Sequence, residues 1–491
     1  MGTLRERLRG WRQRSPHTAT IDTASAAPPP SPLAPVDLSD PNQVAGVMDL
    51  AARIGDILLS SGTANSDTKA QIHAVTSAYG LIWCHVDITL NTITIFTHMG
   101  TQRRSPVSVF RVVRHVSTDF SKLSDVDRLI RSIQAGATPP DVAERILDEI
   151  EVRPTAYGAP TALLGWGIMG GAVALMLGGT ALVGVIAFFT SILIMGVNMY
   201  LDRHSLPLFF QNVFAGIIAT VPASVAYGIA SHYGVQLRPS QIIASGIVVM
   251  LAGLTLVQSL QDGITGAPVT ASARFFETLL FTGAIVAGVG MGIEASSMLG
   301  VHLPPMESIA PPNFNSGWMR VACGGIASGG FAIACYAEWS AVTLSAVAAG
   351  AGGAFYYYLF VPLGLGPVMA GSMASVIIGL AGGLLARRFQ VPPLIIAIAG
   401  ITPLLPGLSV YRGMYSALND QMVVGFTNIA MALATACGLA AGVVLGEWIA
   451  RRIRRPQRFN PYRAFRVARR HSFQEAIHKV PKVAARAVRR R

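Results

Sequence analysis

The chain has 491 residues, of which 52% are hydrophobic and only 13% are charged, and its mean hydropathy is +0.49. Water-soluble domains carry about 25% charged residues, so this composition excludes a purely soluble protein and indicates an integral membrane protein. The formal net charge of +13 is local, because residues 451–491 hold 15 Lys and Arg against one acid, Glu475, and the rest of the chain is nearly neutral.

The two ends of the chain differ from its apolar middle. Residues 1–39 are basic at first and then rich in Pro and Ala, with no apolar core of a secretory signal, and we expect a disordered cytoplasmic arm. Residues 451–491 form a basic tail without a Cys/His finger or a basic sheet with interleaved aromatics, so no nucleic acid is expected as a partner. We predict that the tail binds anionic lipids, at about 1 kcal/mol for each basic residue near the membrane.

Residues 40–155 have the pattern of a small cytoplasmic α/β domain. Turn residues and helix caps separate apolar runs with helical spacing from runs rich in Ile, Thr and Val. The predicted elements, in chain order, are a helix from Asp40-Pro41 to Gly62, a helix from Ser66 or Asp67 to Gly80, one or two strands in 81–97, a strand at 106–113, a helix between Ser124 and Gly136, and a helix from Thr138 to before Pro154.

This region also contains residue types from which a nucleophile and a base can be assembled. They are Ser60, Ser61, Ser66, His73, His85, Asp87 and His98. No GxSxG, phosphate-binding loop or HExxH motif accompanies them, so we favour helix caps for Ser61 and Ser66 and a position on a helix face for His73. The four cysteines are scattered without a CxxC pair, and neither a metal site nor a cofactor is expected.

An internal duplication organises the membrane part. GIVVMLAGLTL (246–256) and GITPLLPGLSV (400–410) are identical at five of eleven positions, with an offset of 154 residues. The same offset aligns AGVGMG (287–292) with AGVVLG (441–446), and each of these contains a GxxxG pattern that predicts close helix packing. Separate matches at one offset indicate two repeats, at 156–300 and 315–450.

Each repeat has room for about five membrane helices of ~20 residues. The fold expected is a mainly α, polytopic membrane protein with ten transmembrane helices. Because five is odd, the two halves would be inverted relative to each other, as in many secondary transporters. Basic residues in short loops place both termini in the cytoplasm. The predicted spans are 160–178, 181–200, 208–230, 240–260, 274–294, 318–337, 340–360, 366–386, 392–411 and 424–449, and prolines at 392, 393, 403 and 406 predict a break in the ninth.

Polar residues concentrate where each repeat passes its fourth span. In the first repeat they lie between 258 and 278, and we expect Arg274 to pair with Glu277 three positions later on one helical face. The candidate substrate or proton pathway residues from both repeats are Gln258, Asp262, Thr270, Ser272, Arg274, Glu277, Arg412, Tyr415 and Asn419. The alternative, left open, is that both segments are ordinary polar loops at the two membrane surfaces.

The sequence resembles the threonine/serine exporter (ThrE) family. The passages that carry the resemblance include VAGVMDLAARIGDILLSSGTANSDTK, PSQIIASGIVVMLAGLTLVQSLQDGITGAPVTASARFFETLLFTG and LARRFQVPPLIIAIAGITPLLPGLSVYRGMY, and they cover most of residues 31–466. The resemblance implies export of L-threonine and L-serine across the plasma membrane, driven by the proton gradient. It does not identify the side chains that bind the substrate.

A zwitterion with a hydroxyl group needs a cation for its carboxylate, an acid for its ammonium group and a polar partner for the hydroxyl. Arg274 or Arg412 could provide the cation, and Asp262 or Glu277 the acid. Glu277 is our first choice for the proton-coupled carboxylate and Asp262 our second. Two alternatives remain, a membrane-tethered hydrolase and a ligand sensor, both of which would use residues 40–155. The sequence leaves the oligomeric state open.

Overall fold

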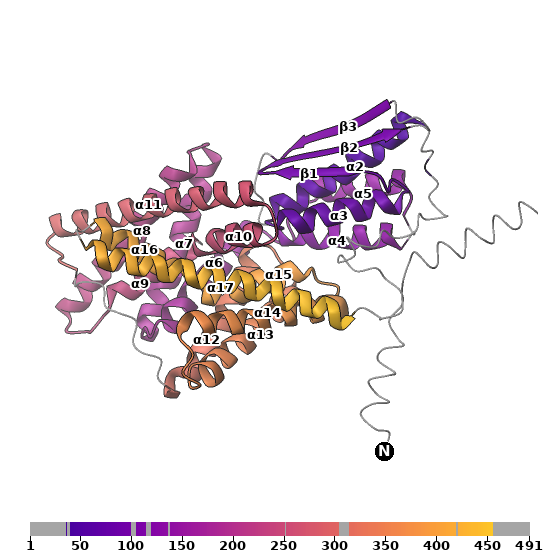
Figure 1. The fold of residues 1–491 in the computed structure, drawn as a ribbon. Coiled ribbons are helices and arrows are strands. Elements are labelled where there is room, and N and C mark those ends of the chain that lie inside the picture. The colour runs from indigo at the N-terminus through magenta and orange to yellow at the C-terminus, as the bar shows by residue number, and fades with distance from the viewer. Residues whose placement is uncertain are drawn as a thin grey trace, which may run out of the picture.

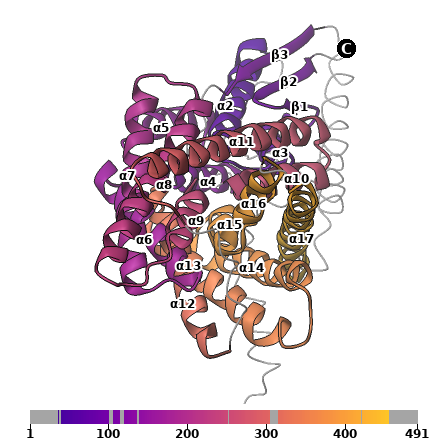
Figure 2. The ribbon, with the colours of Figure 1, turned by 90° about the vertical axis from the view of Figure 1, so that its left-hand side faces the viewer.

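The structure is a computed structural model, and it describes residues 36, 40–99, 105–113, 119–135, 138–250, 252–303, 314–418 and 421–454. Most of the predicted arm, the tail after 454 and the candidate Asn419 lie outside these residues. The described chain has an N-terminal α/β unit (residues 40–152) and a larger helical unit that begins at residue 159 (Figure 1). Figure 2 shows α6, α7 and α8 on one side of the helical unit and α14, α16 and α17 on the other.

The N-terminal unit packs four helices on a three-stranded antiparallel sheet of order β1-β2-β3. In the register, Ile95 in the central strand pairs with Val86 and Val109. Alternate strand residues such as Val86 and Ile93 are fully buried against α2 and its neighbours, as expected for a sheet with one covered face. The elements are α2 (Pro41–Ser60), α3 (Asn65–Ala78), β1 (His85–Thr89), β2 (Thr92–Met99), β3 (Ser105–Val112), α4 (Phe120–Gln134) and α5 (Pro140–Val152).

Of two helix starts predicted from the sequence in the N-terminal unit, one is confirmed and one is wrong. The predicted cap at Asp40 is confirmed, because its Oδ1 accepts a hydrogen bond from the N–H of Asn42 at 2.9 Å. The predicted start at Ser124 is wrong. Asp119 caps α4 instead, and Ser124 lies buried inside that helix with its hydroxyl donating to the carbonyl of Phe120. Asp119 is the better cap, since its carboxylate accepts from two free N–H groups of the first turn.

The helical unit has long apolar helices and two bent pairs. Its elements are α6 (Ala159–Met176), α7 (Ala181–Arg203), α8 (Leu208–His232), α9 (Pro239–Val249), α10 (Ala252–Ile264), α11 (Pro268–Met298), α12 (Phe314–Ala334), α13 (Trp339–Phe355), η1 (Tyr356–Phe360), α14 (Pro367–Phe389), α15 (Pro393–Ile401), η2 (Thr402–Leu404), α16 (Gly407–Leu418) and α17 (Met422–Arg454). Within the described residues, six helices are long and apolar enough to cross a membrane, or up to eight if each bent pair is one span. The protein is therefore a mainly helical, polytopic membrane protein, and the count of ten spans stays a prediction.

The two bent pairs occupy corresponding places in the two predicted repeats. The axes of α9 and α10 differ by 43°, and those of α15 and α16 by 45°. The second break is the one that the prolines at 403 and 406 predicted, and it is confirmed. The first break has no proline at its centre, and it divides the single span predicted at 240–260.

Glycines allow one helix of each repeat to approach another closely. In the first repeat α8 packs on α11, and a Cβ added to Gly288 would collide with the carbonyl oxygen of Val213. In the second, α14 packs on α17, and a Cβ on Gly446 would collide with the carbonyl of Val376. The GxxxG glycines thus serve close helix packing, as predicted.

Candidate functional site

The polar cluster of the first repeat forms at a tight elbow between α10 and α11. Gly266 has φ +96°, a conformation that favours glycine, and Pro268 opens α11 directly afterwards. The elbow brings Arg274, in the second turn of α11, beside Asp262, near the end of α10. Arg274 Nη1 donates to Asp262 Oδ2 at 2.7 Å, and the side chains are 20% and 0% exposed.

This pair corrects one prediction. Arg274 was expected to pair with Glu277 along one helix, but its acidic partner is Asp262 across the elbow. Glu277, about one turn further along α11, is exposed. A carboxylate with no exposed surface needs a cation and hydrogen bonds, and Asp262 has both.

The N-terminal unit completes the cluster. The N–H of Asn65, the first residue of α3, donates to the other oxygen of Asp262, Oδ1, at 3.1 Å. Asn65 Nδ2 also donates to Thr270 Oγ1 at 2.8 Å, and the N–H of Leu90 donates to the same hydroxyl at 3.1 Å. Residue 64 is an alanine that cannot cap α3 with a side chain, so Asp262 takes the place of a cap and lies at the positive end of the helix dipole.

The other candidates of the first repeat lie outside this buried group. The Ser272 hydroxyl is exposed and donates to the carbonyl of Pro268 in its own helix. Gln258 is half-buried, and its side chain lies close to the turn at Gly62. A Cβ added to Gly62 would be 3.0 Å from Gln258 Nε2. The structure therefore brings together Asp262, Thr270 and Arg274, and it separates Ser272 and Glu277 from them.

In the second repeat, the candidates Arg412 and Tyr415 are on α16. The ring of Tyr415 stacks on the fully buried Tyr411, with centroids 5.8 Å apart. Helix α16 contacts α9, α10 and α11 in addition to α17. The broken segments of the two predicted repeats therefore lie against each other.

Sequence reasoning missed one buried cation. Arg320, in α12, is only 7% exposed, and its guanidinium lies 5.7 Å from the ring centroid of Tyr357 in the π-helix η1. One turn later, Gly324 faces Pro403 at the break between α15 and α16. A signal was available, because Arg320 is a charged residue inside the predicted span 318–337, where charge is costly and frequently functional.

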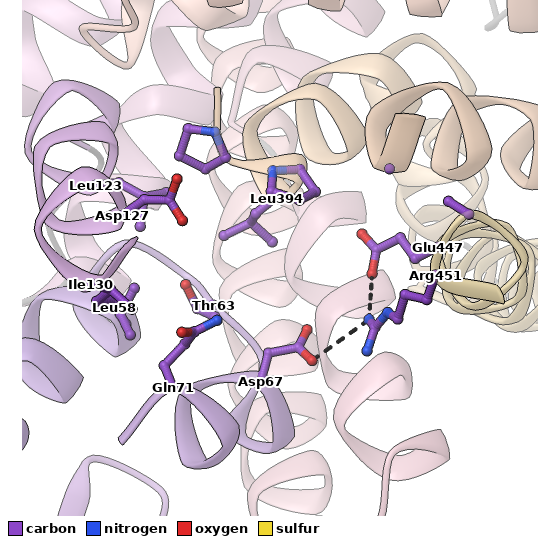
Figure 3. A pocket seen from close by; sticks show the side chains of 14 residues that line it. Leu58, Thr63, Asp67, Gln71, Leu123, Asp127, Ile130, Leu394, Glu447 and Arg451 are labelled. Carbon is purple, nitrogen blue, oxygen red and sulfur yellow. Dashed lines mark hydrogen bonds and ion pairs between the residues drawn. The ribbon is translucent and has the colours of Figure 1, made fainter. Parts of the chain in front are cut away.

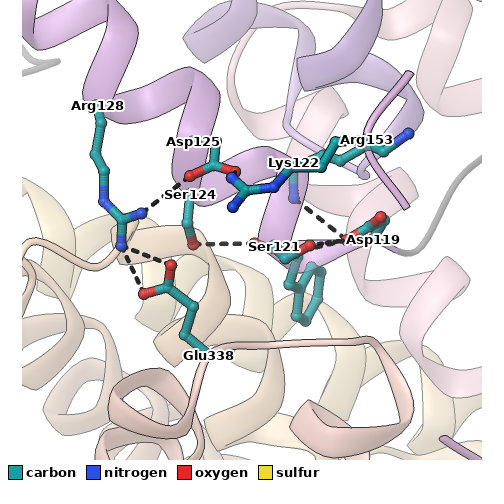
Figure 4. A network of polar contacts seen from close by, with 9 residues as sticks. Asp119, Ser121, Lys122, Ser124, Asp125, Arg128, Arg153 and Glu338 are labelled. Carbon is teal, nitrogen blue, oxygen red and sulfur yellow. Dashed lines mark hydrogen bonds and ion pairs between the residues drawn. The ribbon is translucent and has the colours of Figure 1, made fainter. Parts of the chain in front are cut away.

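A second group of contacts ties the N-terminal unit to the turn between α12 and α13 (Figure 4). Arg128 Nη2 lies 2.6 Å from both carboxylate oxygens of Glu338, and its Nη1 lies 3.0 Å from Asp125. Close by, the N–H of Phe120 donates to the carbonyl of Cys335 at 2.9 Å. The Arg128 and Glu338 side chains are 42% and 32% exposed, so this pair is far better solvated than Asp262–Arg274.

Two of the candidate serines in the N-terminal unit donate to the backbone and not to a histidine. Ser60 and Ser61 donate their hydroxyls to the carbonyl of Ile57 at 3.0 and 2.7 Å. His73 is half-buried, and burial, with smaller effects from Lys69 and His85, lowers its pKa. Over the described ranges, no group of three or more His, Cys, Asp or Glu side chains is placed to hold a metal ion.

Comparisons with known proteins agree on one family. The family model described as "Putative threonine/serine exporter" matches residues 49–295, and the model described as "Threonine/Serine exporter, ThrE" matches residues 320–449. The chain is 67% identical over 457 residues to the "Threonine/serine exporter" of Corynebacterium glutamicum, covering 93% of each chain. It is 38% identical over 414 residues to the "Probable threonine/serine exporter" of Mycobacterium tuberculosis, covering 83% of this chain and 77% of that one.

No solved structure matches the chain. The first family model spans the elbow with Asp262 and Arg274, and the second spans Arg320 and the break between α15 and α16. Both groups of buried charge therefore lie in the matched regions. From these matches, the chain belongs to the threonine/serine exporter (ThrE) family.

Proposed function

We propose that this protein exports L-threonine and L-serine from the cytoplasm across the plasma membrane, in exchange for protons. The observation that carries the proposal is the buried Asp262–Arg274 pair, beside the broken helices α9 and α10 of a chain with close exporter relatives. Broken helices that line an internal site are a recurrent device of secondary transporters.

The pair has the two charges that a zwitterionic amino acid requires. Arg274 binds the substrate carboxylate, and Asp262 binds the ammonium group, after the substrate separates the two side chains. The Thr270 hydroxyl, which already accepts two hydrogen bonds at this site, is the nearest polar partner for the substrate hydroxyl. The charge-assisted contacts of Arg274 and Asp262 with the substrate replace the hydrogen bond that joins these two side chains in the empty site.

Proton coupling requires a carboxylate that alternates between a charged, paired state and a neutral, unpaired state. Asp262 fits this role better than Glu277, because it is buried and has Arg274 as its partner. Protonation of Asp262 would release Arg274, and loss of the proton would restore the pair. Exchange of a proton for the substrate ammonium at one carboxylate gives antiport.

The contacts of the N-terminal unit support the ten-span topology with a cytoplasmic N-terminal domain. This unit touches the α10–α11 elbow, the α12–α13 turn and the end of α17 near Arg451. Ten spans with a cytoplasmic N-terminus put all three places on the cytoplasmic side. The two bends, of 43° and 45°, are similar, and the helix pair α8–α11 of the first half corresponds to the pair α14–α17 of the second. Both observations support two inverted repeats. The basic tail would then lie against the anionic inner leaflet.

Proteoliposomes loaded with labelled L-threonine test the proposal. An imposed pH gradient should drive release of the label, and L-serine inside the vesicles should compete. D262N should abolish gradient-driven release, whereas E277Q, at the same end of the protein but exposed, should retain most of it. Gradient-independent release by the wild type would refute proton coupling, and full activity of D262N would remove Asp262 from the mechanism.

A further inference from the structure

A small cavity lies between the N-terminal unit and the helical unit, away from the Asp262–Arg274 pair (Figure 3). Its volume is about 60 Å³. One wall comes from α2, α3, α4 and the turn before α3, and the other from α14, the start of α15 and the end of α17. The cavity therefore has walls from both units, and it touches the first half of the broken pair α15–α16.

The polar lining is mainly acidic. Asp67, Asp127 and Glu447 contribute three carboxylates, and Arg451 contributes the one guanidinium among the lining residues. Arg451 Nη2 lies 3.2 Å from Glu447 and 3.8 Å from Asp67. Arg131, which does not line the cavity, forms an ion pair with Asp127 at 2.5 Å. The cavity thus favours a ligand with positive charge.

Two buried oxygen atoms in the lining, one on Asp127 and one on Thr63, accept no hydrogen bond within the described chain. Asp127 is 2% exposed; its Oδ2 pairs with Arg131, whereas its Oδ1 accepts no hydrogen bond. Thr63 is 7% exposed, and its hydroxyl is likewise without one. Figure 3 shows both side chains at the same space as Asp67 and Glu447. Buried polar atoms are nearly always hydrogen-bonded, so these oxygens indicate a ligand that donates hydrogen bonds.

We propose that this cavity binds a compact monovalent cation, held by Asp127 and Thr63 on one wall and Glu447 on the other. The cation could be the ammonium group of a small α-amino acid or an inorganic ion. The oxygens of Asp127 and Thr63 that accept no hydrogen bond favour the ammonium group, because it donates hydrogen bonds. The described residues offer no cluster suited to a metal ion that needs three or more such ligands.

The size of the cavity limits what can enter. A cavity of about 150 Å³ holds a benzene molecule, so 60 Å³ accepts the ammonium end of an amino acid and not the whole molecule. The remainder would project past Arg451, whose guanidinium, already paired with Glu447 and Asp67, could also contact a carboxylate. The amino-acid form of the proposal rests on the proposed function, because it makes the exported substrate the ligand.

Binding of substrate at this site would influence the transport helices directly. Pro393, the first residue of α15, and Leu394 line the cavity, so an occupant contacts the N-terminal unit and the broken pair α15–α16 together. A cation that joins Asp127 to Glu447 would hold the two units closed.

The test is calorimetric titration of the purified full-length protein in nanodiscs, with L-threonine, ammonium chloride, KCl and NaCl as separate ligands. D127N removes the negative charge of Asp127 and T63V removes the hydroxyl of Thr63, each with little change of volume. E338Q is the control, because Glu338 ties the same two units together outside the cavity. We expect D127N to weaken the binding of L-threonine ten- to a hundredfold, T63V to weaken it several-fold, and E338Q to leave it within twofold.

The ligands separate the two sources. Competition between L-threonine and ammonium, both sensitive to D127N, identifies the amino-acid ammonium group, whereas D127N-sensitive binding of potassium or sodium alone identifies an inorganic ion. Unchanged affinities for every ligand in both D127N and T63V would overturn the proposal. Export by the same variants, followed in proteoliposomes, keeps the two hypotheses apart. Wild-type export with no D127N-sensitive binding refutes only the cavity site, and D127N-sensitive binding without export refutes only the transport function.

Discussion

Replacing Arg274 with methionine should destabilise the protein strongly, because it leaves a buried carboxylate without its cation. The side chain of Asp262 has no exposed surface and that of Arg274 is 20% exposed. Removal of one partner from a buried ion pair costs about 3–5 kcal/mol, because the remaining charge stays desolvated. Asp262 keeps the hydrogen bond from the N–H of Asn65, so we expect the lower end, about 3 kcal/mol.

R128M is the matched control. It makes the same substitution in an ion pair that also joins the two units, but Arg128 and Glu338 are 42% and 32% exposed. Solvated pairs of this kind contribute about 0.2–1 kcal/mol. The free energy of unfolding, measured by titration of the reconstituted protein with SDS, should fall at least three times more in R274M than in R128M.

A double-mutant cycle tests whether the loss comes from the unpaired charge. D262N removes that charge, so the D262N/R274M protein should be more stable than R274M alone by about 1–3 kcal/mol. Equal losses in R274M and R128M would refute the view that Asp262 and Arg274 form a buried pair, and so would a double mutant no more stable than R274M.

Three further predictions follow from single positions. Burial raises the pKa of Asp127 to about 6, against the smaller opposing effects of Arg131 and Arg128. The folded state therefore binds the proton more tightly than the unfolded state, and stability is lost as the pH rises from about 4 to 6. D127N should raise the unfolding midpoint at pH 8, and this gain should shrink as the pH falls to 4; a gain independent of pH would contradict this. G446A should cost about 1–3 kcal/mol in the SDS titration, because its Cβ meets the backbone of α14, whereas G290A, with no atom within 4 Å, should change stability by less than about 0.5 kcal/mol. R320A should reduce export at least tenfold in proteoliposomes, and Y357F, which keeps the ring under the guanidinium but removes the hydroxyl that Arg320 contacts, should reduce export less than R320A does.

Several features could be predicted from the sequence because they depend on local rules. The low charge content identified a membrane protein, and the caps and turns at Asp40, Gly62 and Gly80 located the helices of the N-terminal unit. Prolines marked the break between α15 and α16 because a proline removes a helical hydrogen bond wherever it occurs. The break between α9 and α10 has no such marker. The repeat alignment offered an indirect one, since Ala252 corresponds to Pro406 at the offset of 154 residues.

The charge pairing was decided by tertiary structure. Local spacing favoured Arg274 with Glu277, three residues apart on one helix. The turn at Gly266 instead folds α11 back along α10 and brings Asp262 to Arg274 from twelve positions away. Burial then decides between the two acids, because an ion pair without solvent needs every lone pair satisfied, and only Asp262 also receives an N–H from α3.

The amino-acid sequence by itself determined the membrane class and the family, and it predicts the duplication and the α/β character of residues 40–155. Each of these is recorded in composition, period or motif. The tertiary structure decided which charges meet, that α3 begins at Asp262, and that the N-terminal unit, α14, α15 and α17 enclose an acidic cavity. These contacts join residues far apart in the chain, for example Asn65 with Thr270, 205 positions apart, and Asp67 with Arg451. They depend on how whole helices pack and on which groups lose solvent, and no local pattern of residues records either.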